Sequence, residues 1–176
     1  MASSLGKLLR TTLKEKRRII TIREDLQIAK AYTDIQMLRL GEQMHLKIDV
    51  TDEFLEKPIP TMTIQPLVEN AVIYGAEEMI DPCEILIYCE PHGEYYDLIV
   101  EDNGPGMDDD ILEKLENHSV EPSGLGIGLL NIHKRLQLEF TDSKCGLNIQ
   151  RINGKTRVAV HLPMEVKTND QTAAGR

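Results

Sequence analysis

Two hairpin signals restrict the possible folds of this chain more than any other feature of its sequence. Residues 146–151 and 156–162 have strand-like patterns and flank Asn153-Gly154, a dipeptide typical of a two-residue hairpin turn. Residues 84–90 and 95–101 form a second such pair, separated by the turn sequence PHGE. Strands joined by turns this short run antiparallel, because a parallel pair needs a long crossover. A purely parallel, doubly wound sheet is therefore not expected.

A long helix is predicted before these strands. It begins at Thr21, which forms a capping box with Glu24, and ends at Leu40, just before Gly41. Its inward-facing stripe is expected to comprise Leu26, Ala29, Tyr32, Ile35, Gln36 and Leu40.

Two more helices are predicted between the strands. One covers residues 63–79, with Pro66 near its first turn, and the other runs from the glycines of 124–128 to about Phe140. A half-buried strand over residues 44–50 should point Met44, Leu46, Ile48 and Val50 inward. Three long helices interspersed with hairpin strands predict an α/β two-layer sandwich.

Composition and charge exclude several classes of function. The chain has 176 residues, of which 41% are hydrophobic, so it can form one packed domain with an appendage. A net charge of −9 argues against non-specific nucleic-acid binding, because such a surface repels phosphate backbones. The sequence has no apolar run of the roughly 18 residues that span a membrane. Cysteines without metal-ligand spacing indicate small buried side chains in a reducing, cytoplasmic setting: Cys83, Cys89 and Cys145.

Asn70 is the first candidate functional residue. It lies in the middle of a predicted helix, where asparagine is unfavourable because its side chain competes for backbone hydrogen bonds. An amide oxygen that faces Mg²⁺ or a polar ligand would compensate for this, although a solvated helix face explains Asn70 equally well. Glu69 and Tyr74, taken alone, indicate only surface or packing positions.

Two glycine-containing motifs follow. Asp102 ends an apolar strand and can accept a hydrogen bond from an exocyclic amine, while Gly104 and Gly106 allow the backbone to approach a flat base. An ordinary turn is the alternative for this motif. The sequence GLGIGL, residues 124–129, opens a helix and offers backbone N–H groups to an anion, although a flexible lid fits equally well. Its spacing matches neither a Rossmann fingerprint nor a Walker loop.

The order and spacing of the three motifs resemble the GHKL ATP-binding fold shared by gyrase, Hsp90, histidine kinases and MutL. The sequences IPTMTIQPLVENA, VEDNGPGM and GLGIGLLNIHKRL are similar to those of the YesM/LytS-type branch of sensor histidine kinases. The resemblance covers about residues 19–163. It implies a mixed, largely antiparallel sheet covered on one face by helices, with ATP and Mg²⁺ as ligands.

The resemblance also implies a role for each motif residue. Asn70 would bind Mg²⁺, Asp102 would accept a hydrogen bond from the adenine N6 amine, and Thr156 would contact adenine through water. Gly104 and Gly106 would form the floor under the base. The remaining nucleotide contacts that it implies are Tyr74, Gly124, Leu125, Gly126, Ile127, Gly128, Leu129 and Asn131.

The sequence departs from this branch at two positions. Members usually carry a basic residue three positions after the motif asparagine, where this chain has Ile73, and often histidine at the next position, where it has Tyr74. Ile73 cannot balance phosphate charge, so Lys134, Arg135 or the metal ion would have to do so. Arg135 is equally consistent with a structural salt bridge.

The phospho-accepting histidine of this branch, with its H-F-L-x-N context, is missing from the sequence. The five histidines present are ordinary core or surface residues: His45, His92, His118, His133 and His161. We therefore expect a fragment that binds ATP but is inactive as a histidine kinase by itself. Residues 1–40 would be the trailing part of dimerisation and linker helices, 41–165 the ATP-binding catalytic domain, and 166–176 a disordered tail.

The resemblance implies partners as well. The parent would be an integral membrane protein with this part in the cytoplasm, acting as a homodimer that passes the γ-phosphoryl group from ATP to histidine and then to a response regulator. A gyrase- or Hsp90-class hydrolase is not expected, because the position of its water-activating glutamate holds Pro66. An anti-sigma-type protein serine kinase or a non-enzymatic nucleotide-sensing module remains the alternative.

Overall fold

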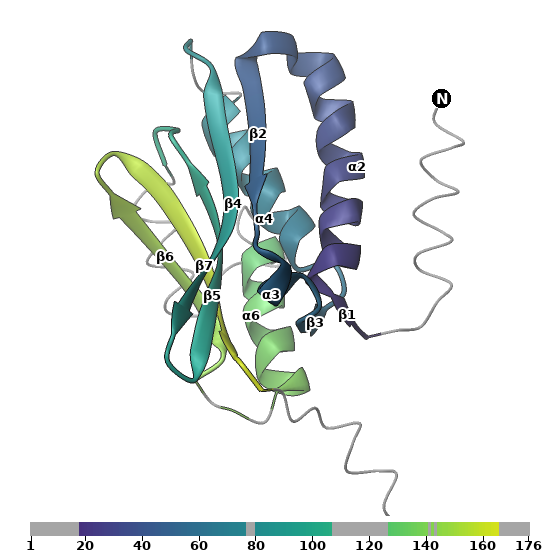
Figure 1. Cartoon of the computed structure of the whole chain (residues 1–176). Helices are drawn as coiled ribbons and strands as arrows, with labels where there is room; N and C mark the ends of the chain where they lie inside the picture. The colour runs from purple at the N-terminus through teal and green to yellow at the C-terminus, as the bar shows by residue number, and fades with distance from the viewer. Residues whose placement is uncertain (1–17, 77–79, 107–126, 141, 143, 166–176) are drawn as a thin grey trace, which may run out of the picture.

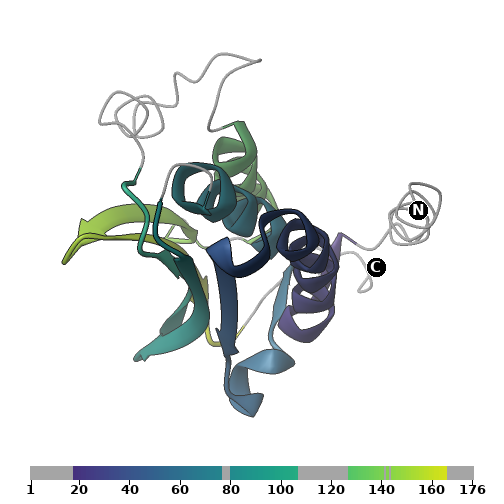
Figure 2. The same ribbon diagram turned by 90° about the horizontal axis from the view of Figure 1, so that it is seen from above.

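The computed structural model describes residues 18–76, 80–106, 127–140, 142 and 144–165. Five strands form one sheet, in the spatial order β2 (Met44–Asp49), β4 (Cys83–His92), β5 (Tyr95–Asp102), β7 (Lys155–Pro163) and β6 (Gly146–Ile152). The long helices that cover one face of this sheet are α2 (Ile22–Leu40), α4 (Ile64–Ala71) and α6 (Ile127–Glu139), as Figures 1 and 2 show. The shorter elements are β1 (Ile19–Thr21), η1 (Gly41–Gln43), α3 (Asp52–Leu55), β3 (Pro58–Pro60) and η2 (Val72–Ala76). The predicted two-layer fold is therefore confirmed.

Both predicted hairpins are present in the sheet. Strands β4 and β5 turn at Gly93 and Glu94, so each strand is longer than predicted and the turn is shorter. Strands β6 and β7 turn at Asn153 and Gly154, whose φ angles of 54° and 80° suit a two-residue turn. Only β2 and β4 pair in parallel, and the other sheet pairs are antiparallel.

Helix α2 begins and ends where the sequence predicts. The Thr21 hydroxyl accepts a hydrogen bond from the Glu24 N–H at 3.2 Å, the Glu24 carboxylate accepts one from the Thr21 N–H at 2.9 Å, and Gly41, with φ 60°, ends the helix. The prediction that Ile35 faces inward is wrong, since its side chain is 40% exposed. The buried positions are Ile22, Asp25, Leu26, Ala29 and Thr33. Ile35 is roughly 200° around the helix from Thr33 and so points away from the core.

The prediction for β2 is also wrong at one residue. Met44 is buried, but Ile48 is 39% exposed. The reason is its place in the fold, because β2 is an edge strand and has a neighbour on one side only.

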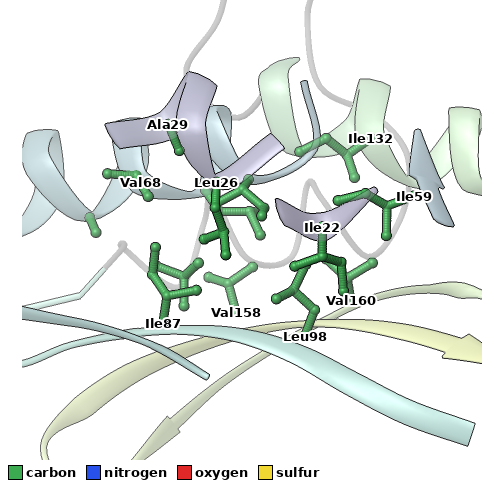
Figure 3. Packing of buried hydrophobic residues seen from close by; sticks show 14 of the residues in the cluster. Ile22, Leu26, Ala29, Ile59, Val68, Ile87, Leu98, Ile132, Val158 and Val160 are labelled. Atoms are coloured by element: carbon green, nitrogen blue, oxygen red, sulfur yellow. The ribbon is translucent and has the colours of Figure 1, made fainter. Parts of the chain in front are cut away.

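The core lies between the sheet and the three long helices. In Figure 3, Leu26 of α2 and Val68 of α4 point toward Val158 and Ile87 of the sheet. Each fully buried aliphatic side chain of this kind contributes about 1.5–3 kcal/mol. Helix α2 therefore packs into the same core as the predicted catalytic region, residues 41–165. The predicted boundary between this region and the linker residues 1–40 stays a prediction. Among the described residues, no helix combines the length and apolarity needed to cross a membrane.

Candidate nucleotide-binding site

Helix α4 carries Asn70 close to its C-terminal end. The Asn70 side-chain nitrogen donates a hydrogen bond to the Pro66 carbonyl oxygen at 2.6 Å, one turn earlier in the same helix. This bond satisfies the amide nitrogen inside the helix, while no described residue donates to the side-chain oxygen. A free amide oxygen of this kind is a suitable ligand for Mg²⁺, which usually takes only one or two protein oxygens beside phosphates and water. The donor set therefore fits the implied metal, although no cluster of acidic or histidine ligands exists among the described residues.

The segment after Asn70 is a π-helical turn, where a continuous α-helix was predicted. Residues Val72–Ala76 form this turn, η2, and residues 77–79 of the predicted helix lie outside the described residues. Single π-helical turns occur frequently at functional sites. Here the turn places Gly75 against Asp102: a Cβ atom on Gly75 would lie 2.7 Å from Cys83 Sγ and 3.5 Å from Asp102 Oδ1. The half-buried Tyr74 side chain packs against the core.

Asp102 is a buried carboxylate at the end of β5, only 4% exposed. Its Oδ1 accepts a hydrogen bond from the Gly104 N–H at 2.9 Å. Burial raises the pKa of Asp102 to about 6, against the lowering effects of the Gly104 N–H and the Arg151 charge; the neighbouring Glu101 charge raises it further. A carboxyl group so placed is ready to accept a hydrogen bond from a ligand amine, which would favour its ionised form.

Thr156 lies directly opposite Asp102 on β7 in the antiparallel register. Its hydroxyl is close enough to help lower the pKa of Asp102, yet no described group forms a hydrogen bond of ordinary geometry with Thr156 Oγ1. Buried hydroxyl groups normally have a partner in the protein or in ordered water. The pair therefore presents an acceptor and an unsatisfied hydroxyl side by side, as a water-mediated contact to a base would require.

The two glycines after Asp102 are required for different reasons. A Cβ atom on Gly104 would lie 2.5 Å from the Gly75 Cα atom, so this loop touches η2 backbone to backbone. Gly106 has φ 88°, a left-handed conformation that favours glycine. A Cβ atom on Gly106 would also lie 2.5 Å from the Arg151 guanidinium and 3.3 Å from Thr156 Oγ1.

Arg151 adjoins the candidate site, although it is not among the residues predicted from the sequence. It lies on β6 directly opposite Thr156, and no described residue forms a hydrogen bond or ion pair with its exposed guanidinium. The position of Arg151 beside Thr156 could have been predicted from the sequence. A two-residue turn at Asn153-Gly154 pairs residue 152 with 155 and residue 151 with 156. Gly75 was missed as well, because the π-helical turn that places it could not be anticipated.

The structure describes only the second half of the glycine-rich motif, residues 127–129 of 124–129. Gly124, Leu125 and Gly126 lie outside the described residues, and Ile127 is the first residue of α6. A Cβ atom on Gly128 would lie 3.5 Å from the Pro66 Cβ atom, so the start of α6 is close to α4, one turn before Asn70. Leu129 is fully buried in the core, and Asn131 is exposed. The described part of the motif therefore adjoins the asparagine helix.

Lys134 and Arg135, the two cations that could balance phosphate charge where Ile73 cannot, lie in different surroundings. Arg135 donates a hydrogen bond to the Met62 carbonyl oxygen at 2.9 Å and interacts electrostatically with Asp25. This engagement supports the structural interpretation of Arg135. Lys134 is exposed, and Ile73 is 39% exposed.

The described histidines make structural contacts or face solvent. His161 is 2.6 Å and His92 is 3.3 Å from the Asp97 carboxylate, His133 accepts a hydrogen bond from the Leu147 N–H, and His45 is exposed. His118 lies outside the described residues.

Known proteins resemble this chain in both sequence and fold. The family model described as "Histidine kinase-, DNA gyrase B-, and HSP90-like ATPase" matches residues 58–166, and a model described as "Histidine kinase" matches residues 1–44. The chain is 40% identical to the sensor histidine kinase YesM of Bacillus subtilis over 93% of its own length and 27% of that protein. It is 30% identical to the sensor protein LytS of Streptococcus agalactiae over 94% of its own length and 29% of that protein.

The solved catalytic domain of histidine kinase ThkA shares the fold, with a TM-score of 0.58 and 16% identity, over 85% of this chain and 97% of that one. The chain thus spans less than a third of the curated relatives' length but nearly all of a solved catalytic domain. The chain belongs to the family of histidine kinase-, DNA gyrase B- and HSP90-like ATPases, and its fold is that of a histidine kinase catalytic domain.

Proposed function

We propose that the chain binds ATP with the adenine base at Asp102 and the magnesium-bound phosphates at Asn70. The observation that carries this proposal is the register pairing of the buried Asp102 carboxylate with the unsatisfied Thr156 hydroxyl. Bound Mg²⁺ would neutralise phosphate charge, and the free Asn70 side-chain oxygen would be its protein ligand.

The glycine-rich segment would complete this site. Backbone N–H groups of residues 124–129 would face the phosphates at the start of α6, where the helix dipole favours negative charge. Asn131 would be a further phosphate contact, and Tyr74 would lie near the ribose or base. These assignments rest on the family resemblance and on the closeness of Gly128 to Pro66.

We further propose that the full-length protein is a histidine kinase. The bond between the β–γ bridging oxygen and the γ-phosphorus would break, a phosphorus–nitrogen bond to a histidine outside this chain would form, ADP would leave, and the imidazole proton would pass to water. Residues 1–40 would connect the nucleotide-binding region, 41–165, to the segment with that histidine. The parent would be a membrane-anchored homodimer with this region in the cytoplasm.

A response regulator is the proposed receiver of the phosphoryl group. A solved complex of histidine kinase ThkA with response regulator protein TrrA has a kinase chain of this fold, with a TM-score of 0.56 and 14% identity over 93% of this chain and 48% of that one. No observation on the described residues favours a serine kinase or a non-enzymatic module, so neither is proposed.

The kinase proposal is tested with γ-phosphate-labelled ATP and the full-length protein. Label that is lost in acid and retained in base is expected, because phosphohistidine is acid-labile. Acid-stable label on a serine of a partner protein would contradict a histidine kinase and support the serine kinase.

The affinity for ATP is expected to depend on pH through Asp102. Because its pKa is about 6, the carboxylate is ionised at neutral pH and becomes protonated as the pH falls through that value. Protonation removes the charged acceptor, so affinity should fall by up to about tenfold per pH unit below 6. Calorimetric titrations between pH 5 and 8, with Mg²⁺ in excess to keep the phosphates ionised, would measure this. An affinity unchanged down to pH 5 would contradict the assignment.

Arg151 is expected to influence the midpoint pH at which ATP affinity begins to fall. Its positive charge lowers the pKa of Asp102, so Arg151→Met should move the midpoint of ATP binding to higher pH, by up to about one unit. Arg151→Lys keeps the charge and should stay near the wild-type value. Equal midpoints for the methionine variant and the wild type would show that Arg151 has no such effect.

A further inference from the structure

One buried carboxylate on α2 holds the start of the asparagine helix. Asp25 is fully buried, and its two oxygens accept hydrogen bonds from the backbone N–H groups of Met62 at 2.7 Å, Thr63 at 2.9 Å and Ile64 at 2.8 Å. The first N–H groups of a helix have no partner within it and need an acceptor. Thr63 precedes α4 but donates its hydroxyl to the Pro60 carbonyl instead of capping the helix. The cap of α4 therefore comes from another helix.

The residue next to this cap adopts an unusual backbone conformation. Met62 has φ 61°, a left-handed value that a side-chain-bearing residue keeps only where its surroundings enforce it. Asp25 binds the Met62 N–H, and Arg135 of α6 binds the Met62 carbonyl oxygen. Both polar groups of this residue's backbone are thus held from outside, by side chains on two different helices.

Asp25 and Arg135 also act on each other. Burial raises the pKa of Asp25, whereas the three N–H groups and the Arg135 charge lower it. Burial lowers the pKa of Arg135, and the Asp25 charge opposes that change. A buried carboxylate and a half-buried guanidinium are tolerated in this arrangement because each charge offsets part of the desolvation cost of the other. The cluster Asp25, Met62 and Arg135 therefore joins α2, the start of α4 and α6.

The cluster lies at the end of α4 opposite Asn70. From Ile64 to Asn70 the helix rises six residues, roughly 9 Å. A short helix moves as one rigid body, so fixing the height and direction of its first turn also fixes the position of the Asn70 side chain. Close backbone packing at Gly75 holds the segment that follows.

We propose that Asp25 is a positioning residue for magnesium-dependent ATP binding, which acts by clamping α4 so that the Asn70 side-chain oxygen meets the metal. The inference rests on the proposed function of this site. It also places α2, which lies within the predicted linker residues 1–40, in direct contact with the start of α4.

The test compares two variants of α2 in the 176-residue chain. Asp25→Asn keeps the shape of the side chain but turns one acceptor oxygen into a donor that faces backbone N–H groups. Thr33→Val is the matched control, because it removes a buried hydroxyl from α2 whose partner among the described residues is the Lys30 carbonyl oxygen of the same helix. Binding of ATP is measured by calorimetry with Mg²⁺ and with EDTA, below the unfolding temperature of each variant.

The gain in ATP affinity on adding Mg²⁺ is the informative quantity. Asp25→Asn is expected to reduce this gain about tenfold and to change the affinity without Mg²⁺ less than twofold, while Thr33→Val keeps the full gain. Amide hydrogen exchange should speed up at Met62, Thr63 and Ile64 in Asp25→Asn only. If Asp25→Asn does not fold, Arg135→Met should still reduce the gain about threefold, because it removes the charge beside Asp25 and the hydrogen bond that holds the Met62 carbonyl oxygen.

Two results would overturn the inference. One is a full Mg²⁺ gain in Asp25→Asn, or in Arg135→Met where Asp25→Asn does not fold. The other is an equal loss of affinity with and without Mg²⁺, which would show a merely structural role. A wild-type chain that gains nothing from Mg²⁺ would contradict the proposed function itself, and the inference with it.

Discussion

Replacing Asp102 with asparagine is expected to stabilise the fold and to weaken ATP binding strongly at the same time. Burial raises the pKa of Asp102 from 3.8 to about 6, so the folded protein disfavours the ionised carboxylate. At about 1.36 kcal/mol per unit, the ionised group destabilises the fold by about 3 kcal/mol at neutral pH. Asparagine removes the charge and still accepts the Gly104 N–H bond, although its new N–H₂ group needs a partner. A net gain of about 1–2 kcal/mol is expected from urea unfolding at pH 7.5.

The raised pKa of Asp102 also predicts how this gain in stability changes with pH. The folded-state pKa lies above the unfolded one, so the destabilisation by Asp102 is complete above about pH 6 and disappears as the pH falls toward 3.8. The stability difference between Asp102→Asn and wild type should therefore shrink between pH 7 and 4. A difference that stays constant over this range, or a less stable variant at pH 7.5, would contradict the assignment.

The loss of binding in Asp102→Asn follows from the hydrogen-bonding groups. An amide presents a weaker, uncharged acceptor and can place a donor against the adenine amine, so affinity should fall at least about a hundredfold, or roughly 2.7 kcal/mol. The same calorimetric titration of ATP measures it. Wild-type affinity in this variant would mean that the base binds elsewhere.

Gly104→Ala is expected to damage both fold and site. The added methyl group would lie 2.5 Å from the Gly75 Cα atom, 2.8 Å from Asp102 Oδ1 and 3.0 Å from the Tyr74 carbonyl oxygen. Two of these three contacts are backbone atoms that cannot move without shifting η2. A loss of about 2–4 kcal/mol in the free energy of unfolding is expected, together with loss of ATP binding.

Gly128→Ala provides the matched comparison for stability. Its methyl group would lie 3.5 Å from the Pro66 Cβ atom, an ordinary contact, in a helix where alanine is favoured over glycine. Its free energy of unfolding should equal or exceed that of the wild type. If the two alanine variants unfold alike in urea, the close contact of Gly104 with Gly75 is not a feature of the folded protein.

Much of the fold could be predicted because its signals are local. The capping box of Thr21 and Glu24 and the turn at Asn153-Gly154 each depend on residues a few positions apart, and both are confirmed. The stripe of α2 was wrong at Ile35, because an apolar residue on a helix does not reveal which side the sheet will cover.

The parts that could not be predicted depend on contacts distant in sequence. Asp25 caps a helix that begins 39 residues later, and an aspartate in the first turn of α2 would ordinarily be explained by the dipole of its own helix. Gly75 meets Gly104 only because a π-helical turn redirects the chain. The roles of Asp102 and Asn70, in contrast, were suggested by the family resemblance, and they stay predictions.

A comparison of ATP with inosine triphosphate tests the central claim most directly. The two nucleotides carry the same ribose and phosphates, but inosine triphosphate has an oxygen acceptor in place of the N6 amine that Asp102 is proposed to bind. Calorimetry with the wild-type chain and excess Mg²⁺ should show ATP binding and an affinity for inosine triphosphate at least about a hundredfold weaker, because two acceptors would then face each other. Equal affinities for the two nucleotides would contradict the placement of adenine at Asp102.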